Sequence, residues 1–288
     1  MAKQIKLLTY AKVNLYLEVL RRRPDGYHDI ESVMQTVSLA DEILLEEAQS
    51  GIEVVCDSPG VPTGKENLAA KAWSAFFAAT GKPPGVRITI TKRIPVAAGL
   101  GGGSGNAAGV LLGLARMYGG NADLHRLAAD IGSDVPFFLD GGTQLAKGRG
   151  TDLEPQKPVA DCWIVLVCPD TSISTAWAYE HLKMPLTRGK DLTTMIQLGL
   201  SRGDVPAVAR ELFNRFESVV FEVYPDLGSL KAEIREHHAL GVVLSGSGPS
   251  LLAIFDLQNT AAMLNRWLTA RGYRSFMVRP VKKGVEIL

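Results

Sequence analysis

Hydrophobic and polar residues alternate along residues 10–20 with a period of two. The apolar positions are Ala11, Val13, Leu15, Leu17 and Val19, and the positions between them are Lys12, Asn14, Tyr16 and Glu18. This alternation is typical of a β-strand with one face in the core and the other toward solvent. Because side chains two positions apart in a strand share a face at a spacing of about 7 Å, Lys12 and Asn14 are expected to be neighbours.

The rest of the first half is predicted to be a mixed sheet backed by helices. The turn-forming residues 23–26 (Arg-Pro-Asp-Gly) predict that the chain reverses here and returns through Tyr27 and His28. Further strands are expected near residues 33–39, 43–47, 52–56 and 86–91, and helices over residues 67–80, 104–118 and 124–131. After the last of these helices, Pro136 is expected to hold Val135 in an extended conformation.

A proline-containing break at residues 155–158 predicts a first domain of residues 1–155 and a second of residues 156–288. In the second, a strand over residues 162–168 is followed by helices near residues 175–182, 192–200, 205–213 and 227–236. Strands over residues 241–245 and 250–256, a helix to about residue 270 and a strand near residues 276–281 complete it. This order predicts an α+β fold with split βαβ character.

The composition argues against several classes of protein. The chain has 288 residues, of which 46% are hydrophobic, and a formal net charge of +1. It can therefore bury a large core, and it lacks the excess of basic residues typical of nucleic-acid binding. No window is apolar enough for a membrane span, and Cys56, Cys162 and Cys168 lack the spacing of a metal site. We therefore expect a cytoplasmic protein in a reducing compartment, with no nucleic-acid or membrane partner.

Residues 94–109 are the most informative stretch of the chain. Their sequence is Ile-Pro-Val-Ala-Ala-Gly-Leu-Gly-Gly-Gly-Ser-Gly-Asn-Ala-Ala-Gly, and it runs without a break into a helix-forming segment. Glycine lets the backbone approach a ligand closely, and the start of a helix exposes unpaired N–H groups that carry about half a positive charge. A glycine-rich loop at the start of a helix therefore predicts a phosphate-binding site.

Other interpretations of this loop are weaker. A Walker-type loop is not supported, because no Lys-Ser/Thr pair follows the last glycine. Residues 103–108 fit the dinucleotide pattern G-x-G-x-x-A, which would indicate an NAD-binding dehydrogenase. The preceding strand, however, ends about a dozen residues earlier, whereas the Rossmann turn is tight. A glycine-rich connection without any ligand is the remaining alternative.

Two charged residues are candidates for chemistry beside this loop. Asp134 lies in the segment Gly-Ser-Asp-Val-Pro of residues 132–136, where an Asx-turn or a helix N-cap is the structural alternative. For Lys12, the alternative is an ordinary solvent-exposed lysine of a strand. Phosphoryl transfer needs a phosphate cradle, a cation for the transferred group and a carboxylate facing the acceptor hydroxyl. The chain contains all three, which favours a kinase.

Three segments resemble the motifs of the GHMP kinase superfamily, which includes galactokinase, homoserine kinase and mevalonate kinase. They are residues 11–15 (Ala-Lys-Val-Asn-Leu), 95–104 (Pro-Val-Ala-Ala-Gly-Leu-Gly-Gly-Gly-Ser) and 244–250 (Leu-Ser-Gly-Ser-Gly-Pro-Ser). Within the superfamily, residues 25–28 (Asp-Gly-Tyr-His) resemble the branch that phosphorylates a cytidine-diphosphate sugar alcohol in non-mevalonate isoprenoid synthesis. The alternatives are another acceptor, such as homoserine or mevalonate, and a non-catalytic nucleotide sensor on the same fold.

The resemblance implies a two-domain GHMP kinase fold. The first domain would be ribosomal S5 domain 2-like, the second ferredoxin-like, and the substrate cleft would lie between them. The resemblance also implies ATP as co-substrate and Mg²⁺ carried with the nucleotide, because no dedicated carboxylate cage is visible in the sequence. A monomer or a weak homodimer is expected.

The resemblance also implies roles for individual residues. Asp134 matches the base that takes the proton from the substrate 2-hydroxyl, and Lys12 matches the lysine that keeps this carboxylate ionised. The positions that match the ATP site are Asn67, Lys92, Pro95, Gly99, Leu100, Gly101, Gly102, Gly103, Ser104, Gly105 and Asn106, with Asn67 and Lys92 near the adenine. The positions that match the substrate site are Asn14, Tyr27, His28 and Tyr179.

In that substrate site, Tyr27 and Tyr179 would stack on the two faces of the cytosine and His28 would read its edge, with Trp177 as the alternative to Tyr179. Gly105 departs from the family pattern, which has a second serine there, so Ser104 is the one hydroxyl expected at this helix start. The sequence leaves open whether the basic residues Lys183, Arg188 and Lys190 contact substrate.

Overall fold

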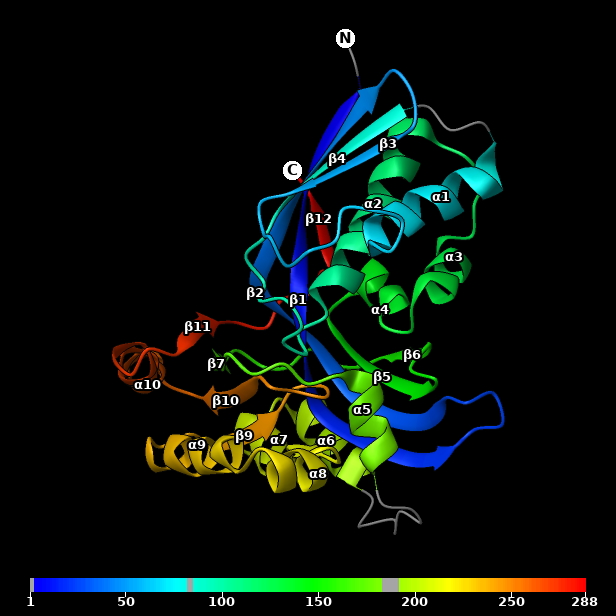
Figure 1. Cartoon of the computed structure of the whole chain (residues 1–288). Coiled ribbons are helices and arrows are strands. Elements are labelled where there is room, and N and C mark those ends of the chain that lie inside the picture. Colours follow the sequence, from blue (N-terminus) through cyan, green and yellow to red (C-terminus); the bar gives the residue numbers. More distant parts are fainter. Residues whose placement is uncertain (1–2, 82–84, 183–191) are drawn as a thin grey trace.

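The computed structural model describes residues 3–81, 85–182 and 192–288. Lys183, Arg188 and Lys190 lie outside the described residues. Two β-sheets form the centre of the molecule, and a group of helices packs against each of them (Figure 1). A hydrophobic cluster between the sheets joins Val13 of the first to Ile164 of the second.

The first sheet is organised by two long antiparallel strands, β1 (Gln4–Arg22) and β2 (His28–Ala48), and the predicted hairpin between them is confirmed. Its other strands are β3 (Ile52–Cys56), β4 (Gly85–Thr91), β5 (Thr143–Gly148), β6 (Asp152–Pro155), β8 (Phe213–Asn214) and β12 (Val285–Ile287). The two strands predicted near residues 33–39 and 43–47 are one strand. The register of β1 against β2 shifts at a bulge between Tyr10 and Ala11. The pairing of β2 with β1 therefore continues through residues 40–42, which separate the two predicted strands.

One face of the first sheet is covered by helices α1 (Leu68–Thr80), α2 (Gly102–Tyr118), α3 (Leu124–Ile131) and α4 (Val135–Asp140). The side chain of Asn67 caps α1 by accepting the amide hydrogen of Ala69 at 2.8 Å. The prediction that Pro136 holds Val135 in an extended conformation is wrong, because Val135 is the first residue of α4. Proline is tolerated in the first turn of a helix, where an N–H group has no intrahelical partner to lose.

Strand β1 is buried on both faces, whereas the sequence predicts one exposed face. All residues from Ala11 to Val19 are buried. Val13 and Leu15 pack toward the second sheet. Lys12 lies on the opposite face, where its Cγ is close to Gly101 at the start of α2. The glycine-rich loop thus covers the polar face of the strand. This contact joins segments far apart in the sequence, so the alternation of residues along one strand could not predict it.

The second sheet has the strand order β11-β7-β10-β9 and is antiparallel throughout. Its strands are β7 (Trp163–Cys168), β9 (Gly241–Leu244), β10 (Leu251–Phe255) and β11 (Arg274–Val278). The helices of this half are α5 (Thr175–His181), α6 (Leu192–Arg202), α7 (Val205–Arg210), α8 (Glu217–Val223), α9 (Pro225–Glu236) and α10 (Gln258–Ala270). This order is the predicted split βαβ arrangement, and the α+β fold class is confirmed.

The chain returns to the first sheet after the second has begun. The short strands β8 and β12, which the sequence did not predict, both pair with β1. Runs of two or three residues are too short for a period to show, so pairing with a distant strand decides them. The division of the chain between residues 155 and 156 stays a prediction.

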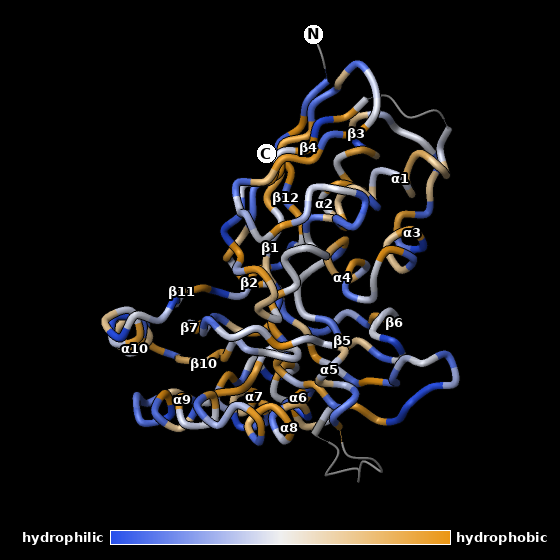
Figure 2. The backbone as a smooth tube through the Cα atoms, in the orientation of Figure 1, coloured by the Kyte–Doolittle hydropathy of each residue, from blue (hydrophilic) through white to orange (hydrophobic). Residues whose placement is uncertain are grey.

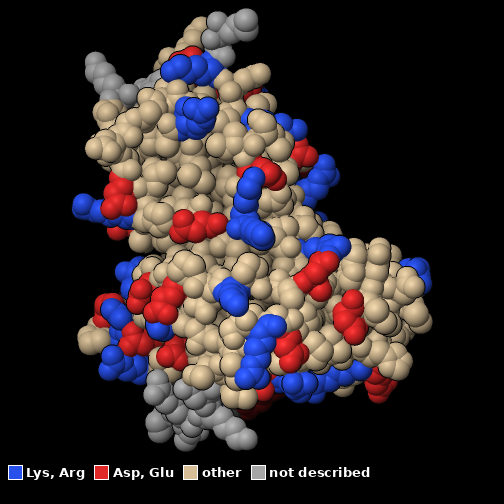
Figure 3. Space-filling model, turned by 180° about the vertical axis from the view of Figure 1, so that it is seen from behind, with Lys and Arg blue, Asp and Glu red and all other residues tan. Residues whose placement is uncertain are grey.

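The distribution of hydrophilic and charged residues agrees with the near-neutral composition of the chain. The hairpin between β1 and β2 is largely hydrophilic, whereas apolar segments concentrate where helices face the sheets (Figure 2). On the face seen in Figure 3, acidic and basic side chains are interspersed rather than gathered into an area of one sign. Within the described ranges, no helix combines the length and the apolar character that crossing a membrane requires.

Candidate active site

The glycine-rich loop ends at the start of α2, where Gly101 adopts the left-handed conformation with φ 72°. No hydrogen bond from a described side chain caps this helix start, so its first N–H groups are available to a ligand. Beside it lies a cavity of about 350 Å³, which we call the loop cavity. Backbone N–H groups at a helix start facing a cavity of this size suit an anion such as phosphate.

All residues that the resemblance assigns to ATP line the loop cavity, except Gly105. Gly105 faces β1 instead: a Cβ atom at this position would lie 3.2 Å from the backbone oxygen of Tyr10 and 3.5 Å from the ring of Phe138. Glycine therefore lets α2 approach the strand closely. Ser104, on the other side of the helix start, does line the cavity.

Several polar side chains of the loop cavity are already engaged with the protein. Lys92 forms an ion pair with the fully buried Asp41, whose Oδ1 also accepts the amide hydrogens of Arg93 and Ile94 at 2.8 Å each. Asn106 accepts a hydrogen bond from Thr9 at 2.8 Å. These bonds fix both ends of the glycine-rich loop against the first sheet. A contact of Asn67 or Lys92 with adenine stays a prediction.

Lys12 and Asp134 are brought together from segments more than a hundred residues apart. The Nζ atom of Lys12 lies 3.4 Å from Oδ2 of Asp134, and it also donates to Oδ1 of Asn14 at 2.8 Å. The side chain of Lys12 is only 6% exposed, so it is not an ordinary solvent-exposed lysine. Asp134 immediately precedes α4, yet its side chain makes no capping hydrogen bond to this described helix. The carboxylate is therefore free to face the amine.

A second glycine-containing turn, residues 245–249, contacts the glycine-rich loop. The hydroxyl of Ser245 donates to the backbone oxygen of Gly99 at 3.2 Å, and a Cβ atom on Gly99 would lie only 2.3 Å from the backbone oxygen of Ser245. Asn214 holds this turn by donating to the backbone oxygens of Leu244 and Gly246 at 2.8 and 2.7 Å. The third sequence motif is thus part of the same site, and Asn214 is a positioning residue that no sequence pattern indicated.

Tyr27, His28 and Tyr179 line one cavity of about 710 Å³, which we call the aromatic cavity. Within it, the rings of His28 and Tyr179 are stacked with their centres 4.7 Å apart. The guanidinium group of Arg149 lies 4.3 Å from the centre of the Tyr27 ring. Its Nε atom is buried and has no hydrogen-bond partner within the described part of the chain. Arg149 lies between two glycines, which indicates a turn but no function.

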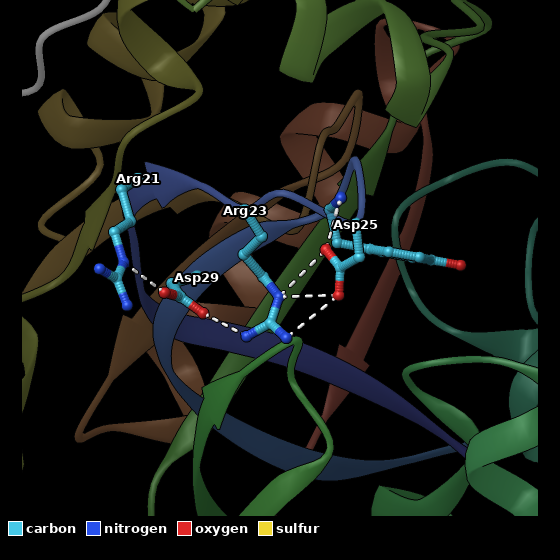
Figure 4. A network of polar contacts seen from close by, with 5 residues as sticks. Arg21, Arg23, Asp25 and Asp29 are labelled. Atoms are coloured by element: carbon cyan, nitrogen blue, oxygen red, sulfur yellow. Dashed lines mark hydrogen bonds and ion pairs between the residues drawn. The ribbon is translucent and has the colours of Figure 1, made fainter.

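A network of ion pairs stabilises the hairpin that carries Tyr27 and His28 (Figure 4). Arg23 lies between Asp25 and Asp29, with nitrogen–oxygen distances of 3.1 and 2.7 Å, and Arg21 binds Asp29 at 2.6 Å. Asp25 also accepts the backbone N–H of Tyr27 at 3.2 Å. These contacts fix the turn, while half of the Tyr27 side chain remains exposed.

Burial shapes the protonation of this aromatic group. Burial raises the pKa of Tyr179, and the negative charge of the nearby Asp134 carboxylate raises it further, so the phenol stays neutral at physiological pH. Burial, together with the positive charge of Arg22, lowers the pKa of His28 below its ordinary value. A neutral imidazole donates one hydrogen bond and accepts another, so His28 is suited to reading a polar edge.

The three cavities adjoin. A central cavity of about 250 Å³ contains Lys12, Asn14 and Asp134. It shares Gly99 and Gly101 with the loop cavity, and Asp134, Thr175 and Tyr179 with the aromatic cavity. Thr175 and Ser247 contribute two hydroxyl groups 3.0 Å apart to its wall. Across the described ranges, no group of three or more His, Cys, Asp and Glu side chains is arranged to hold a metal ion.

A glycine-rich loop at a helix start, beside a buried lysine paired with an aspartate and in contact with a second glycine turn, is the arrangement expected of a small-molecule kinase of the GHMP type. The sequence agrees: residues 67–142 match the N-terminal domain of GHMP kinases and residues 196–274 match their C-terminal domain. The fold also resembles that of L. major mevalonate kinase in complex with R-mevalonate, with a TM-score of 0.75 at 17% identity over 98% of this chain and 99% of that one.

Proteins with higher sequence identity to this chain show which family of GHMP kinases it belongs to. The chain is 40% identical to the 4-diphosphocytidyl-2-C-methyl-D-erythritol kinase of Geobacter sulfurreducens, over 97% of this chain and 100% of that protein. A crystal structure of 4-(cytidine 5'-diphospho)-2C-methyl-D-erythritol kinase matches with a TM-score of 0.83 at 36% identity, covering 96% of this chain and 99% of that one. The chain therefore belongs to the 4-diphosphocytidyl-2-C-methyl-D-erythritol kinase family of GHMP kinases.

Proposed function

We propose that this chain transfers the γ-phosphoryl group of ATP to the 2-hydroxyl of 4-diphosphocytidyl-2-C-methyl-D-erythritol, releasing ADP and the 2-phosphate. The reaction would serve non-mevalonate isoprenoid precursor synthesis. The observation that carries the proposal is the Lys12–Asp134 pair, which lies where the loop cavity and the aromatic cavity meet through the central cavity. The family to which the chain belongs supports the choice of acceptor.

In the proposed reaction, Asp134 accepts the proton of the acceptor hydroxyl as its oxygen attacks the γ-phosphorus. The bond between this phosphorus and the oxygen bridging to the β-phosphate breaks, and ADP leaves with the electron pair. Lys12 stabilises negative charge on the transferred group, because its ammonium lies in a buried site where charge interactions are strong. The N–H groups at the start of α2 hold the remaining phosphates.

Magnesium enters the proposal with the nucleotide. The Ser104 hydroxyl lines both the loop cavity and the aromatic cavity, and it is the kind of hard oxygen ligand that Mg²⁺ takes beside phosphate oxygens. When bound, the cation would neutralise charge on the phosphates. The cytoplasmic location, the monomeric or weakly dimeric state and the lack of a nucleic-acid partner stay predictions.

The aromatic cavity would take the cytosine. Stacking of the base on Tyr179 requires the ring of His28 to move from the face of Tyr179 to the edge of the base, since His28 now covers that face at 4.7 Å. A perpendicular contact with the ring of Phe216, with ring centres 4.8 Å apart and an interplanar angle of 88°, holds the tyrosine in place. Tyr27 would supply the second stacking surface.

The direct test is ³¹P NMR of the purified protein with ATP and the cytidyl substrate. We expect the γ-phosphate resonance of ATP to be lost as those of ADP and a new phosphomonoester appear. CDP should compete with the substrate, whereas homoserine or mevalonate should neither be phosphorylated nor compete. Absence of transfer by folded protein would refute the proposal, and phosphorylation of homoserine or mevalonate instead would show that the site is a GHMP kinase for another acceptor.

Replacing Tyr27 by alanine is expected to weaken CDP binding by about 1–2 kcal/mol, which is about 5- to 30-fold, because one stacking surface is lost. Isothermal titration calorimetry measures the change directly. Tyr27→Phe is the matched control, since it keeps the ring and should bind CDP within about twofold of the wild type. Equal binding by Tyr27→Ala and wild type would place the base elsewhere in the cavity.

A further inference from the structure

Ser32 lies on β2 and is fully buried beneath the site, outside every motif of the sequence. Its hydroxyl donates to the backbone oxygen of Tyr16 at 2.7 Å. Its oxygen accepts a hydrogen bond from Nδ2 of Asn14 at 2.8 Å. A serine hydroxyl has a single hydrogen, and here that hydrogen is used by Tyr16. Ser32 can therefore act only as an acceptor toward Asn14.

This constraint fixes the orientation of the Asn14 amide. Because Nδ2 faces Ser32, Oδ1 faces the other way and accepts from Nζ of Lys12 at 2.8 Å. With the amide reversed, two donor groups would face each other in a buried site, which is costly. Asn14 thus presents an oxygen to the amine of Lys12, and the same amine lies 3.4 Å from Asp134.

A β-bulge makes this arrangement. Asn14 pairs with Met34, but Tyr16 pairs with Val33 and Leu17 with Ser32, so the register of β1 against β2 shifts between Asn14 and Tyr16. The shift brings the Ser32 hydroxyl within reach of both the Tyr16 carbonyl and the Asn14 amide. Bulges recur beside active sites because they re-aim side chains in this way.

We propose that Ser32 is a positioning residue for phosphoryl transfer, acting through the Asn14 amide to hold the amine of Lys12 beside Asp134. Lysine has a flexible stem with several rotamers, and an oxygen partner at a fixed place selects one of them. The proposal rests on the proposed function of the site. It assigns no contact with substrate to Ser32.

The test is a double-mutant cycle on kcat. Ser32→Ala is expected to lower kcat by about 10- to 100-fold, because small displacements of a catalytic group have effects of this size. The Kd for ATP, measured by calorimetry, should stay within about twofold of the wild type. In an Asn14→Asp background, whose two carboxylate oxygens are both acceptors, the same substitution should lower kcat less than about threefold. If Ser32→Ala lowered kcat equally in both backgrounds, the proposal that Ser32 acts through the Asn14 amide would be refuted.

Two further measurements separate this proposal from its alternatives. Ser38→Ala on the same strand, where the hydroxyl accepts the amide hydrogen of Arg279 at 3.0 Å, is the control for loss of a strand hydroxyl and should keep the wild-type kcat. Acetylation of Lys12 by a small amine-reactive ester, followed by peptide mass spectrometry, requires no turnover. It should accelerate severalfold in Ser32→Ala, and an unchanged rate would refute the proposal even if the wild type phosphorylates a different acceptor.

Discussion

Asp134→Asn is expected to reduce kcat by about 10²–10⁴-fold while both substrates still bind. The amide keeps the size of the carboxylate and an oxygen that can face Lys12, but it does not accept the proton of the acceptor hydroxyl. Steady-state kinetics with ATP and the cytidyl substrate measure kcat, and calorimetry with CDP measures binding. We expect a change in kcat with little change in the affinity for CDP. Asp134 lies beside Lys12 in the central cavity and only at the border of the aromatic cavity, which is proposed to take the cytosine.

The matched control for this variant is Asp130→Asn. Asp130 lies in α3, is exposed and lines none of the three cavities as the structure describes them. It undergoes the same loss of charge close by in the sequence, so its activity should equal that of the wild type. Near-normal turnover by Asp134→Asn would show that another group takes the proton.

Gly99→Ala is expected to destabilise the protein and weaken ATP binding together. Gly99 has φ 75°, where a residue with a side chain costs about 1–2 kcal/mol. In addition, the new methyl group would lie 2.3 Å from the backbone oxygen of Ser245, and backbone cannot rotate away as a flexible side chain can. The contact between the glycine-rich loop and the turn at residues 245–249 must therefore open, and ATP affinity should fall by about tenfold or more. Urea unfolding and calorimetry with ATP measure the two effects.

Gly103→Ala is the control for stability. Gly103 is in α2, and the nearest atom that a Cβ would meet among the described residues is Cδ1 of Leu68 at 3.7 Å, an ordinary contact. Alanine in a helix is favoured over glycine by about 0.8–1 kcal/mol, so this variant should unfold at an equal or higher urea concentration than the wild type. If Gly99→Ala unfolds at the same urea concentration as Gly103→Ala, the close contact with Ser245 does not exist in solution.

Elements with a strong local pattern were predicted best from the sequence. The strand over residues 52–56 and the helix over residues 124–131 have the predicted bounds. The α+β class and the ferredoxin-like second half were also predicted correctly. The elements that were missed are α4, α8, β5, β6, β8 and β12, each of seven residues or fewer, and a period needs several turns or alternations to be recognised.

For the site, the sequence identified the glycine-rich loop because glycines before a helix form a local signature. Lys12 and Asp134 were singled out by their combination with this loop and by the family resemblance, since neither has a distinctive local signature. It did not identify Asn214 or Ser32, and it gave Arg149 no role beyond lining the pocket, where the structure places it. Their importance comes from what they contact: a backbone turn, a tyrosine ring and an amide on a neighbouring strand. None of these relations has a fixed spacing along the chain.

The sequence by itself determined the chemical inventory of this protein. Residue type and local periodicity indicated the glycine-rich loop before a helix, and the family resemblance pointed to the amine of Lys12, the carboxylate of Asp134 and a set of aromatic residues. Only the tertiary structure decided how they are combined. The bulges in β1 set which side chains face the loop, and the packing of α2 and the turn at residues 245–249 against that strand buries Lys12 beside Asp134. The physical reason is that hydrogen bonding and close packing between segments far apart in the chain depend on register and distance, which neighbouring residues in the sequence do not specify.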